Sequence, residues 1–249
     1  MDVLYIVIPA YNEEENIEAL IHDWYPVIEK HDAGGKSRLV VVNDGSRDGT
    51  LEILRACAAD HTRLIILDKP NGGHGPAVLY GYRYAIKRKA DYIFQTDADG
   101  QTNPAEFEAF WKIRGRYDAV IGYRPDRQDG ASRVFVEKVL VFLLRMIFGV
   151  RVPDANAPFR LMRTEAVERY LPLMPKTYNL PNVILTTCFA YFGDALRFEP
   201  ISFRPRQGGT NSINLEKITK IGWQALHDFR VIHRRMKSER KGGTLWNLP

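Results

Sequence analysis

Short apolar runs alternate with segments of helical periodicity along the first half of the chain, and this alternation limits the possible folds more than any other feature. The apolar runs lie at residues 3–8, 38–42, 64–67, 92–96 and 119–123. Continuous runs of this length are typical of strands that are buried on both faces of a parallel sheet. Strands that alternate with helices predict βαβ units with right-handed crossovers. The chain is therefore expected to be an α/β protein with a mostly parallel sheet flanked by helices.

Helices are expected between these strands. In the first helix Asn12 is the predicted N-cap, because Glu15 follows at capping-box spacing and apolar residues from Ile17 to Trp24 recur at helical intervals. Further helices are predicted at about 51–58, 77–89 and 104–114, the last with Pro104 in its first turn.

The second half of the chain has a less regular pattern. It predicts a strongly apolar helix at 134–148, a short strand at 159–162, a helix or strand at 183–192, a late strand at 196–203 and a long amphipathic helix at 215–239. In that long helix Ile218, Ile221, Ala225, Phe229, Ile232 and Met236 form one apolar stripe. We expect a catalytic domain over residues 1–212 and a basic amphipathic helical extension over 213–249.

Length and composition exclude several classes of protein. A chain of 249 residues with 45% hydrophobic and 26% charged residues suits one α/β domain with a sizeable core and excludes disorder as the main state. Its two cysteines have no ligand-like spacing, so neither a disulfide framework nor a zinc site is indicated. Met1-Asp2 leads directly into the first apolar run without the features of a signal peptide, and a cytoplasmic location is the expectation.

No membrane span is expected, although contact with a membrane is. A span needs about 20 apolar residues, and the longest candidate, 134–150, is interrupted by Glu137, Lys138 and Arg145. Net charge is +5, and basic residues are concentrated from Arg230 onward. A basic amphipathic helix of this kind is typical of peripheral attachment to the cytoplasmic membrane face.

Polar or glycine-rich segments follow four of the predicted strands, at 11–13, 44, 71–75 and 97–101. In parallel α/β sheets, ligands bind beyond the carboxyl ends of the strands. Asp97 and Asp99 are two residues apart and point the same way while the backbone stays extended, and Gly100 permits a turn that brings Gln101 back toward them. Such hard oxygen ligands suit Mg²⁺ or Mn²⁺ bound together with substrate phosphates. An isolated pair of aspartates at this spacing more often only caps the following helix or lies in a turn, and the rest of the chain is what favours a metal site.

The motifs together resemble family 2 glycosyltransferases with the GT-A fold, a Rossmann-like fold that binds nucleotide sugars. The resemblance rests on Pro9-Ala10-Tyr11-Asn12-Glu13, Asn43-Asp44-Gly45-Ser46 and Asp97-Ala98-Asp99. Nearly the whole chain is most similar to dolichol-phosphate mannose and polyprenyl-phosphate sugar synthases, through the segments 154–163, 199–204 and 208–212.

The resemblance implies roles for particular residues. The residues implied in nucleotide-sugar binding are Pro9, Tyr11, Glu13, Asp44, Asp97 and Ala98. Asp97, Asp99 and Gln101 are implied as metal ligands, and Asp99, Arg124 and Arg160 as catalytic residues. Arg124, Arg160 and Arg206 are implied in contacts with acceptor or donor phosphates, which a guanidinium binds in a bidentate manner. Asp154 is interpreted as a partner of Arg160.

Two positions depart from the family pattern. The loop usually written NxGKG reads Asn71-Gly72-Gly73-His74-Gly75, so that His74 replaces a permanent cation. Pro158 stands where the family usually has glycine and stiffens the turn before Arg160.

The acceptor is predicted from a missing acid. A sugar hydroxyl needs a carboxylate base, whereas a lipid phosphate is already an anion at pH 7. Family members with hydroxyl acceptors typically carry an acidic pair ahead of a late helix, and the matching segment 178–185 contains no acid. The main prediction is therefore a metal-dependent enzyme that moves a hexose from a UDP- or GDP-sugar to polyprenyl phosphate. The family resemblance implies that the transfer inverts the configuration at C1.

Alternative functions stay open at this point. A family 2 enzyme that acts on a glycan hydroxyl in capsule, cell-wall or lipopolysaccharide synthesis would need a base, and Asp154 is the first candidate. A basic module that binds nucleic acid or membranes on a degenerate fold is not expected, because the metal motif is intact. A dinucleotide-binding oxidoreductase is also disfavoured, because no G-x-G-x-x-G follows the first strand.

Overall fold

The structure is a computed structural model that describes residues 2–125, 131–204 and 215–242. Its strands are β1 (Leu4–Ala10), β2 (Arg38–Asn43), β3 (Leu64–Asp68), β4 (Tyr92–Gln95), β5 (Ala119–Tyr123), β6 (Arg160–Arg163) and β7 (Leu196–Pro200). Its α-helices are α1 (Ile17–Lys30), α2 (Thr50–Asp60), α3 (His74–Lys87), α4 (Phe107–Ile113), α5 (Ala131–Phe148), α6 (Thr164–Tyr170), α7 (Pro181–Phe192) and α8 (Leu215–Gly242). Short 3₁₀ turns are η1 (Pro104–Glu106), η2 (Arg114–Arg116) and η3 (Leu171–Leu173).

The described strands form one sheet in the order β3-β2-β1-β4-β6-β5-β7. Strand β6 runs antiparallel to both β4 and β5, and the other neighbouring pairs are parallel. The predicted α/β fold with a mostly parallel sheet is confirmed. The insertion of β6 between β4 and β5 was not predicted, because pairing between distant segments leaves no local pattern.

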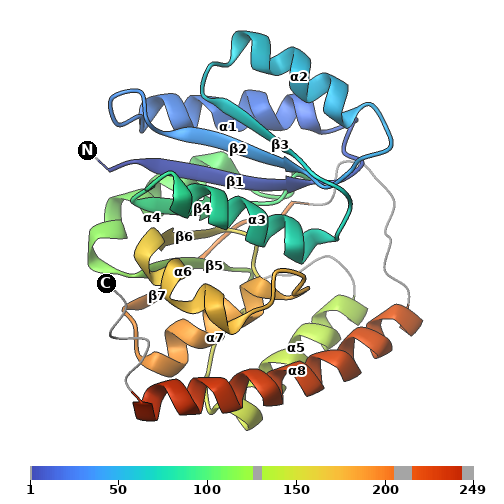
Figure 1. The fold of residues 1–249 in the computed structure, drawn as a ribbon, viewed down its shortest axis with the longest axis vertical. Helices are drawn as coiled ribbons and strands as arrows, with labels where there is room; N and C mark the ends of the chain where they lie inside the picture. The colour runs from blue at the N-terminus through green and yellow to red at the C-terminus, as the bar shows by residue number, and fades with distance from the viewer. Residues whose placement is uncertain (1, 126–130, 205–214, 243–249) are drawn as a thin grey trace.

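Helices cover both faces of the sheet and divide the core into two clusters (Figure 1). Side chains alternate between the faces along β1: Leu4, Ile6 and Ile8 pack with α1, α2 and α4, whereas Tyr5 and Val7 pack toward α3 and α7. All seven residues of β1 are buried, as its continuous apolar run predicts for a central strand.

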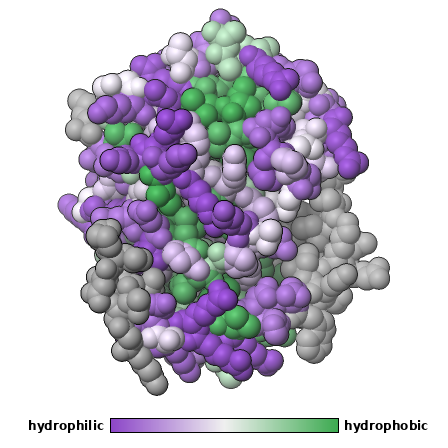
Figure 2. All heavy atoms as spheres, in the orientation of Figure 1, coloured by the Kyte–Doolittle hydropathy of each residue, from purple (hydrophilic) through white to green (hydrophobic). Residues whose placement is uncertain are grey.

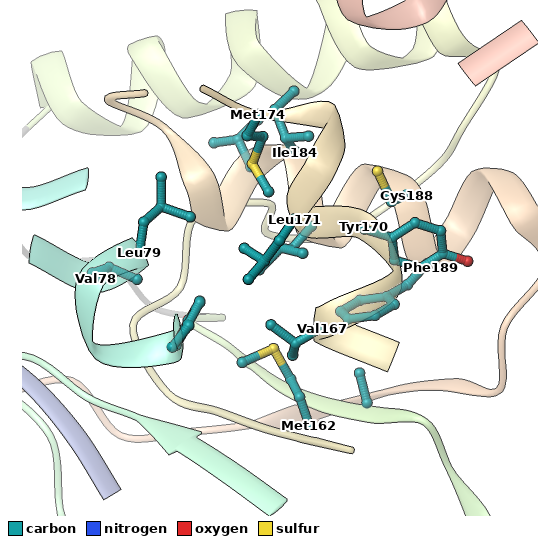
Figure 3. Packing of buried hydrophobic residues seen from close by; sticks show 14 of the residues in the cluster. Val78, Leu79, Met162, Val167, Tyr170, Leu171, Met174, Ile184, Cys188 and Phe189 are labelled. Carbon is teal, nitrogen blue, oxygen red and sulfur yellow. The ribbon is translucent and has the colours of Figure 1, made fainter. Parts of the chain in front are cut away.

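The second face of the sheet is covered by α3, α6 and α7, which pack closely together (Figure 3). Val78 and Leu79 of α3 lie in one cluster with Met162 of β6 and Phe189 of α7. Every residue of α7 from Pro181 to Phe189 is buried, and a helix that is buried all round has no polar face in its sequence. The segment 183–192, for which the sequence allowed a helix or a strand, is therefore a helix.

Helix α8 packs against α5 and against the same core cluster. Its side chains Ala225, Phe229, Ile232 and Met236 are buried, as the predicted stripe requires, and the rings of Phe148 and Phe229 lie 5.8 Å apart. The side chains of the other two residues of that stripe, Ile218 and Ile221, lie outside the described part. The division at residues 212 and 213 stays a prediction.

The prediction for the start of the first helix was wrong. Helix α1 begins at Ile17 after Asn16, whereas Asn12 adopts a positive φ of 53° and its amide N–H donates to Ser46 Oγ at 3.0 Å. Residues before α1 form a turn, because contacts with the loop after β2 outweigh the local capping signal. The late strand is also shorter than predicted, since β7 ends at Pro200.

The face seen in Figure 2 is mostly hydrophilic, and hydrophobic atoms are visible only in limited areas. Among the described residues, no helix has the length and apolar character that crossing a membrane would require.

Candidate active site

Loops at the carboxyl ends of β1 and β2 are joined by hydrogen bonds between their backbones and side chains. The amide of Arg47 donates to Asn12 Oδ1 at 2.9 Å, and the amide of Glu13 donates to Thr50 Oγ1 at 2.9 Å. Pro9 lies within β1 opposite Val42. The predicted nucleotide-binding residues at these strand ends are thus held on one edge of the sheet, with Tyr11 exposed and Glu13 buried.

Asp44 holds the glycine-rich loop that follows β3. Its buried carboxylate accepts hydrogen bonds from the amides of Gly72 at 3.0 Å and Gly73 at 2.7 Å, and it pairs with the ammonium group of Lys69. A carboxylate that accepts from several donors fixes the backbone around it. Asp44 therefore shapes the loop next to the predicted nucleotide site.

Asp97 follows β4, and its carboxylate is oriented by the buried side chains of Gln95 and Tyr82. Gln95 donates from Nε2 to Asp97 Oδ1 at 3.1 Å, and the hydroxyl of Tyr82 donates to Gln95 Oε1 at 3.2 Å. Burial raises the pKa of the Tyr82 hydroxyl, so this group stays protonated and remains a donor. The next residue, Ala98, is buried.

Asp99 and Gln101 form the turn after the strand. Gly100 has a φ of 70°, and the amide of Gln101 donates to Asp99 Oδ1 at 3.2 Å. The side-chain amide of Gln101 donates to the carbonyl of Arg204 at 2.9 Å, while the Arg204 amide donates to the Gln101 carbonyl at 2.8 Å. We name residues 97–101 the aspartate turn. Gln101 thus holds this turn to the segment that follows β7.

The donor set fits an ion that completes its coordination with substrate. Asp97 and Asp99 present carboxylates from one short turn, and both side chains are partly accessible. Within the described ranges, no three acidic, imidazole or thiol groups form a preformed metal site. Two carboxylates with open positions are the arrangement that Mg²⁺ or Mn²⁺ uses when substrate phosphates supply the other ligands.

The partner predicted for Asp154 was wrong. Its carboxylate accepts from Arg124 Nε at 2.8 Å and from Arg124 Nη2 at 3.2 Å, so it pairs with Arg124 and not with Arg160. Only 6% of the Arg124 side chain and 4% of the Asp154 side chain are exposed. The Arg124 guanidinium also lies 4.9 Å from the centre of the Phe203 ring. Arg124 is therefore fixed at the end of β5, beside the segment that Gln101 contacts.

Arg160 is fully buried under the site. Its guanidinium donates to the carbonyls of Ala157 at 2.8 Å and Asn182 at 3.0 Å and to Thr186 Oγ1 at 3.3 Å. Burial lowers the pKa of this guanidinium below its ordinary value, and the opposing effect of the nearby Tyr82, Asp154 and Asp97 offsets only part of this decrease. In this arrangement Arg160 joins the segment before β6 to the start of α7. Its predicted phosphate contact stays a prediction, and Arg206 lies outside the described residues.

The segment without an acid lies against the glycine-rich loop. The N-terminus of α3 approaches it so closely that a Cβ atom on Gly75 would stand 2.3 Å from the Tyr178 carbonyl oxygen. The polar side chains in this segment are Asn179, which faces Gly73, and the buried Asn182. The position at which a catalytic acid was sought is thus beside the site and carries amides.

Three supporting residues were missed from the sequence. Lys69 stands at the end of the strand that precedes the glycine-rich loop, so its position at the site edge could have been noticed. Tyr82 and Gln95 gave no signal, because each looks like an ordinary residue of a helix or strand and acts only through long-range contacts.

The sequence of this chain matches a known protein family. The model of the family described as "Glycosyl transferase family 2" matches residues 5–171, which is more than half of the chain and includes the aspartate turn. The chain belongs to glycosyl transferase family 2. The resemblance drawn from the motifs is confirmed.

Two relatives in this family are undecaprenyl-phosphate 4-deoxy-4-formamido-L-arabinose transferases. The protein from Shewanella sediminis is 33% identical over 195 residues, covering 76% of this chain and 56% of the relative. The protein from Pectobacterium atrosepticum is 30% identical over 189 residues, covering 74% and 55%. This chain spans little more than half the length of these relatives.

Solved glycosyltransferase structures share the fold. A glucosyl-3-phosphoglycerate synthase from Mycobacterium tuberculosis, in complex with Mn²⁺, UDP and phosphoglyceric acid, has a TM-score of 0.68 at 19% identity and covers 93% of this chain and 78% of that one. The same enzyme with Mn²⁺, UDP-glucose and phosphoglyceric acid has a TM-score of 0.67 at 18% identity, covering 93% and 80%. At this identity the likeness shows the fold alone.

Proposed function

We propose that this glycosyltransferase moves a sugar from a UDP- or GDP-sugar to a polyprenyl phosphate. Hexose stays the prediction for the sugar. The names of the undecaprenyl-phosphate transferases from Shewanella sediminis and Pectobacterium atrosepticum support a lipid phosphate as the acceptor. The intact Asp97 and Asp99 pair supports a nucleotide diphosphate as the leaving group.

The ion pair between Arg124 and Asp154 is the observation that carries the choice of acceptor. Asp154 was the first candidate for the base that a sugar hydroxyl would need. Its carboxylate is buried and bound by two donors of Arg124, which leaves it poorly placed to take a proton from substrate. A phosphate acceptor needs no base and gains from a positioned guanidinium.

The proposed roles follow from where the residues lie. The nucleotide would be lined by Pro9, Tyr11, Glu13, Asp44 and Ala98. Asp97, Asp99 and the side-chain oxygen of Gln101 would hold Mg²⁺ or Mn²⁺. When bound, the ion supplies positive charge that stabilises the departing diphosphate. Arg124, oriented by Asp154, would hold the acceptor phosphate in line with the sugar carbon, so that the phosphate oxygen attacks C1 with inversion. Arg160 would hold the segment before β6 against the start of α7.

A lipid acceptor requires contact with a membrane, and α5 carries a suitable surface. Val136, Val139, Phe142 and Met146 recur at helical spacing, and 60% of Phe142 and 67% of Met146 are exposed. We name these four residues the α5 apolar face. Exposed Lys138 and Arg145 lie on the same helix.

Helix α8 adds positive charge beside this face. Its exposed cations within the described part are Arg230, Arg234, Arg235, Lys237 and Arg240. Each cation near an anionic bilayer contributes about 1 kcal/mol to attachment. We propose that the bilayer covers the α5 apolar face and that residues 213–249 act as the membrane-directed extension of the catalytic domain 1–212.

The function is tested by nucleotide diphosphate release. Purified protein is incubated with Mn²⁺ and a panel of UDP- and GDP-sugars, with and without short-chain polyprenyl phosphate. Release that requires the lipid and yields a lipid-linked sugar is the expected result. Asp99→Ala should abolish it, while Asp23→Ala, at an exposed position on α1, serves as the matched control. Consumption of a donor only with an oligosaccharide acceptor would overturn the proposed acceptor.

A further inference from the structure

His74 is the first residue of α3 and faces the aspartate turn. Its Nε2 atom lies 3.7 Å from Asp97 Oδ1, and 51% of the His74 side chain and 25% of the Asp97 side chain are exposed. The two groups come from strand ends that are separate in the sequence. Both face a region that substrate can reach.

The separation of these atoms has a simple physical meaning. A distance of 3.7 Å is too long for a hydrogen bond. Two ligands that each lie about 2.1 Å from one ion stand about 3.0 Å apart at right angles and about 4.2 Å apart on opposite sides. The observed distance falls between these limits, so one ion can contact both atoms with little movement.

Both groups are held by rigid parts of the fold. Asp97 Oδ1 accepts from Gln95 at 3.1 Å, and a carboxylate oxygen has a second lone pair for an ion. On the other side, Gly73 adopts a φ of 93° to turn the chain into α3, and the close approach of Gly75 to Tyr178 fixes the start of the helix. The pair is therefore positioned before any ligand arrives, as a metal site needs.

Resting on the proposed function, we propose that His74 Nε2 and Asp97 Oδ1 bind the same divalent ion. This nitrogen ligand makes the site selective for Mn²⁺ over Mg²⁺. Mg²⁺ and Mn²⁺ both bind oxygen from carboxylates, carbonyls and water, but Mn²⁺ belongs to the transition-metal series whose members also accept imidazole nitrogen, so a histidine ligand favours Mn²⁺ of the two. His74 then determines metal choice, which the two aspartates alone do not.

The test measures nitrogen bound to manganese directly. The full chain is produced with ¹⁵N-labelled histidine in otherwise unlabelled protein, and Mn²⁺ is added with UDP or GDP. Electron–nuclear double resonance of the bound Mn²⁺ should show a ¹⁵N coupling, which nucleotide nitrogen cannot produce because it is unlabelled. The coupling should disappear in His74→Gln and remain in His22→Gln, since 89% of the His22 side chain is exposed on α1.

Metal affinity gives a second readout that does not depend on turnover. Titration should show that His74→Gln weakens Mn²⁺ binding by about 10-fold or more and changes Mg²⁺ binding much less. Circular dichroism checks that the variant folds.

Bound Mn²⁺ without a ¹⁵N coupling, or a coupling that persists in His74→Gln, would overturn the inference and leave the proposed function intact. Equal loss of Mn²⁺ and Mg²⁺ affinity would also overturn it. If the wild-type protein bound Mg²⁺ but no Mn²⁺, only this inference would fail, whereas binding of neither ion would overturn the metal-dependent function as well.

Discussion

Asp154 and Arg124 form a buried ion pair with two hydrogen bonds, of 2.8 and 3.2 Å, at the end of β5. The Arg124 guanidinium lies next to the Phe203 ring. The residue after Phe203 is Arg204, whose carbonyl accepts a hydrogen bond from the side chain of Gln101 in the aspartate turn. The pair thus links the predicted acceptor arginine to the metal motif through one continuous set of contacts.

Asp154→Asn should weaken acceptor binding more than it slows turnover. The amide keeps the shape but removes the charge that orients Arg124, so we expect the acceptor KM to rise about 10-fold with a smaller change in kcat and in donor KM. Loss of a general base would instead lower kcat by about 10²–10⁴-fold. Steady-state kinetics with varied acceptor separates the two results, and Asp23→Asn is the control.

Arg160→Lys should destabilise the protein. Lysine has no planar fork and cannot replace both the Nη2 bond to the Ala157 carbonyl and the Nη1 bond to the Asn182 carbonyl. We expect the free energy of unfolding to fall by at least about 2 kcal/mol. Urea denaturation measures this, with the exposed Arg116→Lys as the control. Equal midpoints for the two variants would show that the buried fork adds no stability.

Gly75→Ala should also be destabilising, through a backbone clash. The added Cβ would stand 2.3 Å from the Tyr178 carbonyl oxygen and 2.6 Å from the Asn179 backbone. Overpacking of this kind costs about 1–3 kcal/mol. At Gly115 an added Cβ meets nothing within 4 Å, so Gly115→Ala is the matched control in the same thermal or urea melts. Unchanged stability in Gly75→Ala would mean that α3 can move away from this segment.

Polar substitutions on the α5 apolar face should reduce membrane attachment without changing the fold. Phe142→Ser combined with Met146→Ser removes the two most exposed side chains of that face. We expect co-sedimentation with vesicles that contain anionic phospholipid to fall several-fold. The release of nucleotide diphosphate with a short-chain, water-dispersed acceptor should be unchanged. Exposed Tyr80 on α3, changed to serine, is the control. Unaltered sedimentation of the double variant would argue against the face.

The contribution of Glu108 to the free energy of unfolding should be lost at acid pH. Hydrogen bonds from Lys30 and then from His31 lower the pKa of the Glu108 carboxyl below its ordinary value. Because the folded pKa is lower than the unfolded one, the contribution is complete above the unfolded pKa of about 4.3 and is lost as pH falls through the folded pKa. The difference in unfolding free energy between wild type and Glu108→Gln should therefore shrink toward acid pH. A difference that stays constant from neutral to acid pH would contradict this.

Local sequence determined the strands and the metal motif. The apolar runs at β1, β2 and β4 are buried on both faces and could form little else, and Asp97 and Asp99 stand where such a strand must end. The family followed from the same features, because a motif is carried by neighbouring residues whose spacing the chain itself fixes.

Tertiary structure alone decided the partners of the charged groups. Asp154 is six residues from Arg160 and thirty from Arg124, yet the antiparallel entry of β6 between β4 and β5 turns Arg160 into the core and leaves Asp154 facing Arg124. For the same reason, Asn12 does not cap the first helix, because it binds the loop after β2 instead. Side-chain partners depend on which distant segments the sheet brings together, and that order is a property of the whole fold, which no local pattern records.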